Sequence, residues 1–174
     1  TFLGTESAVL FVSGHATNVT TMEILFGAGD LVVFEAGSLS SSIVDGALVS
    51  GAEVMCFPTG DLEALDRILG SVRRRYRKVL IAVEAVCSTN AKIADLPRLI
   101  ALKKRHQAFL LVDEDNSLGV LGATGRGLCE HHHVDPREVD AITGGLHKSL
   151  ASSGGFLAGN GALVARNARM ATGS

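Results

Sequence analysis

The chain has 174 residues, with 16 Lys and Arg against 18 Asp and Glu, and a formal net charge of -2. Hydrophobic residues make up 47% and charged residues 20%, which excludes a chain that is disordered throughout. The near-neutral charge and the 5% aromatic content, with no Trp, give no basis for binding nucleic acid or an anionic membrane. The mean hydropathy of +0.30 predicts apolar surface that a partner, a further domain or another subunit covers.

The cysteines and the lengths of the apolar runs indicate the cellular compartment of the protein. Cys56, Cys87 and Cys129 are far apart and lack metal-ligand spacing, which indicates buried or free thiols in a reducing compartment. No apolar run reaches the roughly 20 residues of a membrane-spanning helix. The first residues also lack the basic start of a signal peptide. We therefore expect a cytoplasmic protein without a transmembrane segment.

Short apolar runs alternate with amphipathic stretches along the whole chain. This pattern predicts an α/β fold, a mainly parallel sheet flanked by helices, in one domain over residues 1–174. The expected strands are Ala8–Val12, Asp30–Phe34, Glu53–Phe57, Val79–Val83, Phe109–Val112, Ala141–Thr143 and Gly155–Ala158. The expected helices are Ala16–Phe26, Ser42–Ser50, Asp61–Tyr76, Leu96–His106 and Ala162–Met170, with Asp61 as an N-cap.

Two stretches rich in small residues interrupt the alternation, Gly119–Gly127 and Ala151–Gly155. Both follow expected strands, at the edge where open α/β sheets bind ligands. Glu130 and His131–His133 could bind a metal, but three adjacent His cannot all face one ion, so we expect a solvated loop and no metal. The basic run from Arg73 to Lys78 suits a helix C-terminus or the steering of an anionic thioester.

Three segments of the sequence suggest cofactor chemistry, and each has a plainer alternative. Asp113 ends an expected buried strand, where a carboxylate can hold a proton on a pyridinium nitrogen or cap a turn. Lys148 follows another strand among small residues, so it could capture a cofactor aldehyde or be a surface lysine. Ser13 and Gly14 open an expected helix, where backbone N–H groups suit a phosphate or an ordinary turn.

Several stretches together resemble the large domain of the α-oxoamine synthases, fold-type I pyridoxal-phosphate (PLP) enzymes that include 8-amino-7-oxononanoate synthase, 2-amino-3-ketobutyrate CoA ligase and serine palmitoyltransferase. The resemblance lies in GTESAVLFVSGHATN, SIVDGALVSGAEV, VEAVCSTNAKIADLPRLIALKKRH, LLVDEDNSLGVLGATGRGLCEH and VDAITGGLHKSLASSGGFLAG. It covers essentially the whole chain in order, and the GVLG-x-x-GRG-x-x-EH motif shortly after the aspartate is its most specific part. The resemblance implies a large domain of a longer polypeptide, without the family's small domain.

The resemblance also implies roles for individual residues. Lys148 would form the Schiff base with PLP, and Asp113 would pair with the pyridine nitrogen. Ser88 would hydrogen-bond near the phenolic oxygen of the cofactor. Ser13, Gly14 and His15 would lie at the phosphate. Asn18 matches a family Asn and would be structural.

This sequence departs from the family at several cofactor positions. Ser40 stands where a His stacks on the cofactor ring, and Asn116 stands where a His lies near the phenolic oxygen. Gly145 and His147 replace two hydroxyl residues, at least one of which contacts the phosphate. His147, if charged, could supply part of that contact. Lost contacts of this kind would weaken cofactor binding by a few kcal/mol, on the order of a hundredfold.

The implied activity is condensation of an amino acid with an acyl thioester, such as an acyl-CoA, to an α-amino ketone. The alternative is a degenerate, non-catalytic member of the same fold that acts as a scaffold or partner subunit. A different PLP-dependent activity on the same fold, an aminotransferase or a lyase, is a more distant option. The resemblance also implies a homodimer or heterodimer whose site is completed across the subunit interface.

Overall fold

The computed structural model describes residues 1–37 and 41–171. A seven-stranded sheet has the order β1-β7-β6-β5-β4-β2-β3. Its strands are β1 (Ser7–Phe11), β2 (Leu31–Glu35), β3 (Glu53–Phe57), β4 (Val79–Glu84), β5 (Phe109–Asp113), β6 (Ala141–Gly145) and β7 (Gly155–Gly159). Neighbouring strands from β3 to β6 are parallel, whereas β7 runs antiparallel to both β6 and β1. The predicted class, a mainly parallel sheet flanked by helices, is confirmed.

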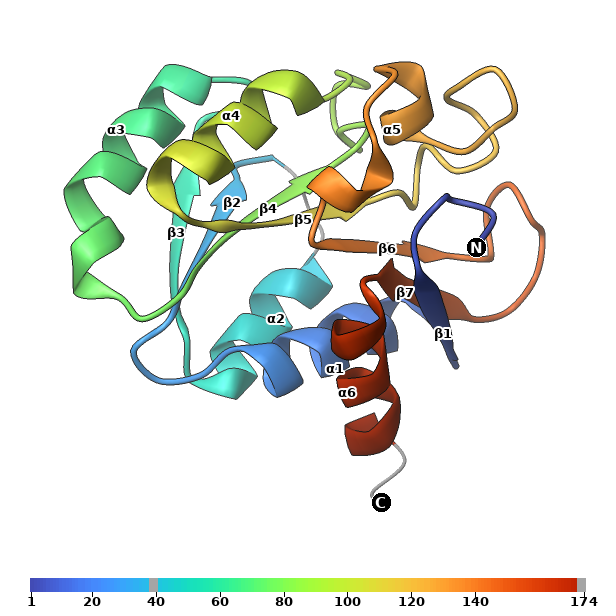
Figure 1. Cartoon of the computed structure of the whole chain (residues 1–174), viewed down its shortest axis with the longest axis horizontal. Helices are drawn as coiled ribbons and strands as arrows, with labels where there is room; N and C mark the ends of the chain where they lie inside the picture. The colour runs from blue at the N-terminus through green and yellow to red at the C-terminus, as the bar shows by residue number, and fades with distance from the viewer. Residues whose placement is uncertain (38–40, 172–174) are drawn as a thin grey trace.

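Helices cover both faces of the sheet (Figure 1). One layer contains α3 (Leu62–Val72), α4 (Leu96–His106) and the short α5 (Leu128–His131). The other contains α1 (Gly14–Leu25), α2 (Ser41–Ser50) and α6 (Gly161–Ala171). Two 3₁₀ turns, η1 (Arg73–Arg75) and η2 (Pro136–Glu138), complete the elements. None of the helices over residues 1–37 and 41–171 is long and apolar enough to cross a bilayer.

The central strand β4 shows why the sheet is covered on both sides. All six of its residues are buried. Successive side chains of a strand point to opposite faces, so Val79, Ile81 and Val83 join the core under α3 and α4. Leu80 and Ala82 join the second core under α1 and α2. The first five residues of β4 are apolar and contribute to a core on each side, so the strand needs a helix layer on both faces of the sheet.

The helix starts follow local chemistry. The Asp61 carboxylate accepts a hydrogen bond from Ala64 N at 2.8 Å, which confirms the predicted N-cap of α3. The predicted helix over residues 61–76 is too long at its end, because α3 stops at Val72 and gives way to η1. There Arg73 leaves the helical pattern to donate from Nε to the carbonyl of His106 and from a terminal nitrogen to that of Tyr76.

Helices α1 and α2 approach each other closely at one glycine. A Cβ added at Gly46 would lie 2.8 Å from Val19 Cα and 2.9 Å from Met22 Cβ. Only a residue without a side chain fits between the two helices at this point. This contact sets the position of α1 relative to α2.

Candidate active site

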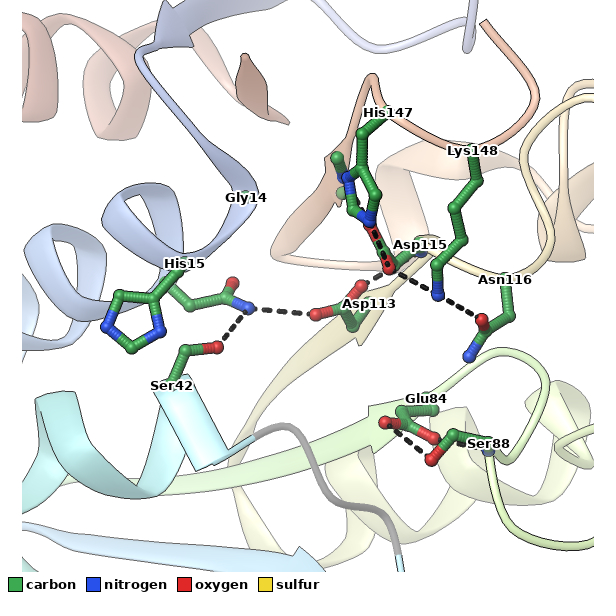
Figure 2. Close-up of a pocket in the computed structure, with 13 residues that line it drawn as sticks. Gly14, His15, Ser42, Glu84, Ser88, Asp113, Asp115, Asn116, His147 and Lys148 are labelled. Atoms are coloured by element: carbon green, nitrogen blue, oxygen red, sulfur yellow. Dashed lines mark hydrogen bonds and ion pairs between the residues drawn. The ribbon is translucent and has the colours of Figure 1, made fainter. Parts of the chain in front are cut away.

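A cavity of about 220 Å³ lies where β4, β5 and β6 end and α1 begins. Parallel strands bring their carboxyl ends to one edge, and ligands of open α/β sheets bind there. The cavity is lined by Gly14, His15, Asn18, Ser42, Glu84, Ser88, Asp113, Asp115, Asn116, Gly144, Gly145, His147 and Lys148. Figure 2 shows the side chains of Asp113, Asp115 and Asn116 lying close to that of Lys148, more than 30 residues further along the sequence.

Asp113, the last residue of β5, is 5% exposed. Its Oδ2 accepts from Asn18 Nδ2 at 2.9 Å and its Oδ1 accepts from Asp115 N at 2.9 Å. Burial raises the pKa of Asp113 to about 6, and these two hydrogen bonds oppose the rise. The carboxyl is therefore largely ionised at neutral pH. The carboxylate caps the turn at Asp115 and also lines the cavity. Its geometry therefore fits both roles considered for Asp113, capping a turn and pairing with a pyridinium nitrogen.

Lys148 reaches into the cavity from the segment after β6 (Figure 2). Its Nζ lies 2.6 Å from Asp115 Oδ2 and also donates to Asn116 Oδ1. The side chain is 42% exposed, which leaves the amine accessible from solvent. Lys148 is therefore exposed, as the surface-lysine alternative expects, and at the same time it is paired and lines the cavity.

The beginning of α1 forms another wall of the cavity. Gly14 and His15 line it, whereas the Ser13 hydroxyl caps the helix by accepting from Ala16 N at 3.0 Å. A Cβ at Gly14 would lie 3.2 Å from Gly145 Cα, so the helix start rests directly on the end of β6. The unpaired N–H groups and the dipole of a helix N-terminus favour an anion.

Ser88 and Asn116 lie on the opposite side from α1 (Figure 2). The Glu84 carboxylate accepts from Ser88 N at 2.7 Å and from Ser88 Oγ at 3.4 Å. Asn116 donates to the carbonyl of Val86 at 3.1 Å, which fixes its amide oxygen toward Lys148. His147 is 58% exposed, with Nε2 3.8 Å from Asp115 Oδ2.

The structure brings all the predicted site residues to this cavity except Ser13, which serves as the cap. Ser40, the position of the ring-stacking His, lies outside the described residues. The two stretches rich in small residues, Gly119–Gly127 and Ala151–Gly155, follow the carboxyl ends of β5 and β6 as expected, but neither lines this cavity. Part of Gly119–Gly127 instead borders a separate groove with Phe2 and Leu150.

Sequence reasoning missed Glu84, Asp115 and Ser42 as residues of the cavity. Glu84 could have been found, because it ends β4 as Asp113 ends β5, and the two are paired in the register. Asp115 follows Asp113 by two residues in the same polar segment. Asn18, assigned a structural role, lines the cavity and joins Asp113 to Ser42 through its amide, at 2.9 and 3.1 Å.

The remaining candidates serve packing and tethering. His132 contacts the carbonyl of Ala94 at 2.9 Å. Within the described parts of the chain, no cluster of three or more His, Cys, Asp or Glu could hold a metal. Arg73, Arg77 and Lys78 bind backbone carbonyls or Asp30. Cys87 is buried.

A sheet of this order, with a lysine and a buried aspartate facing one cavity, is the arrangement of fold-type I PLP domains. The sequence profile described as aminotransferase class I and II matches residues 1–174, and the chain belongs to this family. Within it, the chain is 39% identical to human serine palmitoyltransferase 3 over 94% of its own length and 31% of that protein. The suggested kinship with the α-oxoamine synthases is confirmed.

Solved structures agree in fold. The serine palmitoyltransferase of Sphingomonas wittichii has a TM-score of 0.89 and 34% identity, covering 97% of this chain and 41% of that one. An SPT structure with a PLP internal aldimine has a TM-score of 0.88 and 34% identity, over 98% of this chain and 42% of that one. The chain thus spans less than half the length of these relatives.

Proposed function

We propose that the chain is the cofactor-binding large domain of a PLP-dependent α-oxoamine synthase that condenses an amino acid with an acyl thioester, such as an acyl-CoA. The observation that carries the proposal is the pair formed by Lys148 and Asp113, an amine and a buried carboxylate that line one cavity. The serine palmitoyltransferase relatives support this reaction class.

The residues present fit PLP. The buried carboxylate of Asp113 is placed to pair with a protonated ring nitrogen, the Lys148 amine is accessible for an aldehyde, and the start of α1 offers N–H groups to a phosphate. When bound, PLP supplies an electron sink for a carbanion at the amino acid's α-carbon.

The chain's own side chains orient and carry protons in this arrangement. Asn18 donates to Asp113 Oδ2 and fixes the carboxylate against rotation. Asp113, whose pKa of about 6 leaves it largely ionised at neutral pH, would accept a hydrogen bond from a protonated ring nitrogen and keep that proton in place. With PLP bound, Lys148 Nζ would serve as the base for the amino acid's α-proton, and Asn116 Oδ1, which accepts a hydrogen bond from Nζ, would keep that amine on the cavity side.

A trapping experiment tests the proposal. The purified chain is mixed with PLP and treated with borohydride, and peptide mass spectrometry should place the reduced adduct on Lys148. Lys148→Ala should remove the adduct, while Lys104→Ala, an exposed lysine paired with Glu138, should leave it unchanged. Absence of an adduct on the wild-type chain would contradict the proposal and favour a non-catalytic scaffold.

A second assay addresses the reaction class. An amino acid and an acyl-CoA together should release free coenzyme A thiol from the complete protein, and Lys148→Ala should abolish that release. Thiol release with the amino acid omitted would indicate simple thioester hydrolysis. Transfer of the amino group to an oxo acid would instead indicate an aminotransferase.

We further propose that the chain works as a homodimer or heterodimer in the cytoplasm. Exposed apolar side chains support a covered surface, among them Leu10 at 70%, Val12 at 83% and Val120 at 67% exposure. The three cysteines are free thiols, which supports a reducing compartment. The molar mass in solution, by light scattering, tests the dimer, and fluorescence microscopy of a tagged protein tests the location.

A further inference from the structure

Asp115 places a second carboxylate in the cavity, beside the reactive amine. Its Oδ2 lies 2.6 Å from Lys148 Nζ, and its Oδ1 accepts from Gly145 N at 2.8 Å. His147 Nε2 lies 3.8 Å from the same Oδ2. The Asp115 carboxylate therefore contacts a backbone N–H at the end of β6 and two side chains, Lys148 and His147, on the segment that follows β6 (Figure 2).

The absence of a side chain at Gly145 makes room for this carboxylate. A Cβ at Gly145 would overlap Asp115 Oδ1 and lie 2.5 Å from His147 Nδ1. Gly145 also touches the start of α1, because a Cβ at Gly14 would lie 3.4 Å from Gly145 N. The Asp115 carboxylate is thus bonded to a backbone N–H beside the helix terminus where an anion is favoured.

The charged side chains that line the cavity show how Asp115 would affect an incoming anion. Glu84, Asp113 and Asp115 contribute carboxylates, and Lys148 contributes the ammonium. Two of the anions have other donors, since Ser88 binds Glu84 and Asn18 binds Asp113. Asp115 is the anion paired with Lys148, so an incoming anionic ligand competes with it for Lys148 and for the Gly145 N–H.

We propose that Asp115 is a positioning residue that acts as an internal counter-ion: it holds Lys148 in the cavity and weakens the binding of a phosphorylated aldehyde. This inference rests on the proposed function, since it concerns the capture of PLP by Lys148. An ammonium bonded to a carboxylate is not a nucleophile, so capture requires the pair to open. The phosphate, moreover, meets a negative charge beside the start of α1.

Paired titrations of the purified chain with PLP and with unphosphorylated pyridoxal test this inference. Asp115→Ala should bind PLP at least tenfold more tightly than the wild type, which is about 1.4 kcal/mol, and should gain less for pyridoxal. Asp115→Asn, which keeps the shape and an oxygen for Gly145 N, should reproduce most of the gain. Glu63→Gln removes the same charge from an exposed pair with Arg98 and should change neither affinity.

The outcomes separate the inference from the proposed function. Equal or weaker PLP binding by both Asp115 variants would overturn the inference while trapping on Lys148 still supports the function. An equal gain for PLP and pyridoxal would also overturn it, because the phosphate would then feel no effect of the carboxylate. No adduct on Lys148 in any variant would refute the function itself. Circular dichroism and thermal melting confirm that each variant is folded.

Discussion

Replacing Gly155 by Ala tests how β7 sets the position of the cavity's helix. An added Cβ would lie 2.5 Å from Thr17 Oγ1 and 2.6 Å from both Cα and N of Gly14. Favourable contacts between packed carbon atoms lie at about 3.5–4.0 Å. Two of the three neighbours are backbone atoms of a helix already capped by Ser13, so the first turn of α1 must move as a unit.

Overpacking costs about 1–3 kcal/mol, and the backbone contacts place Gly155→Ala near 3 kcal/mol. For a domain of this size we expect the thermal midpoint to fall by about 6–12 °C. The urea midpoint should fall with an unchanged slope. PLP should also bind more weakly, because the displaced turn carries the N–H groups that face the cavity.

Gly70→Ala is the matched control. The nearest heavy atom to its added Cβ is His106 Cε1 at 3.8 Å, and Gly70 is a solvent-exposed residue within α3. Alanine there should stabilise the helix by about 1 kcal/mol. If Gly155→Ala melted at or above the wild-type temperature, the close packing of β7 on α1 would be refuted.

Three further predictions concern stability. Burial raises the pKa of Glu114 to about 7, so the folded chain holds a proton that the unfolded chain releases. The free energy of unfolding should therefore fall as pH rises from about 4.5 to about 7. Urea melts at several pH values should show a flatter pH dependence for Glu114→Gln. An unchanged slope of unfolding free energy against pH would contradict the raised pKa of Glu114. Gly145→Ala should lower the free energy of unfolding by about 1–3 kcal/mol. In a double-mutant cycle followed by urea midpoints, Asp115→Ala should recover part of this loss. Strictly additive effects would show that the side chains at positions 145 and 115 do not interact. Asp61→Ala should cost about 1 kcal/mol in thermal unfolding, and an unchanged midpoint would show that the cap bond to Ala64 adds nothing.

The strands were predictable because each is a short apolar run between turn residues, and β4 and β5 show this most clearly. What the sequence could not show is the place of β7. Its residues pair with β1, about 150 positions away, and with β6, and both pairings are antiparallel. Local periodicity carries no information on such distant partners. The helix α5 escaped prediction because it has only four residues and depends on Glu114, which accepts from Leu128 N.

The cavity was predicted to a similar extent. Lys148 and Asp113 stand in recognisable contexts, so they could be assigned in advance. Asp115 could not, since its partners Gly145 and Lys148 lie 30 or more residues away and meet it only across the sheet edge. The substitution Gly145→Thr, which would return a hydroxyl side chain to this position, depends on Asp115: the new Cβ would overlap Asp115 Oδ1, so a smaller residue is required at position 115 as well.

The pairing of β1 with β7 joins two segments that lie about 150 residues apart in the sequence. During synthesis on the ribosome, β1 emerges before the other strands of this sheet. It cannot pair with β7 until residue 159 has left the exit tunnel. The strands β2 to β6 can already assemble in that interval, since their partners lie within their own span. The edge of the sheet beside α1 is therefore finished last, and a nascent chain cut short before β7 would lack the backbone that supports the cofactor cavity on that side.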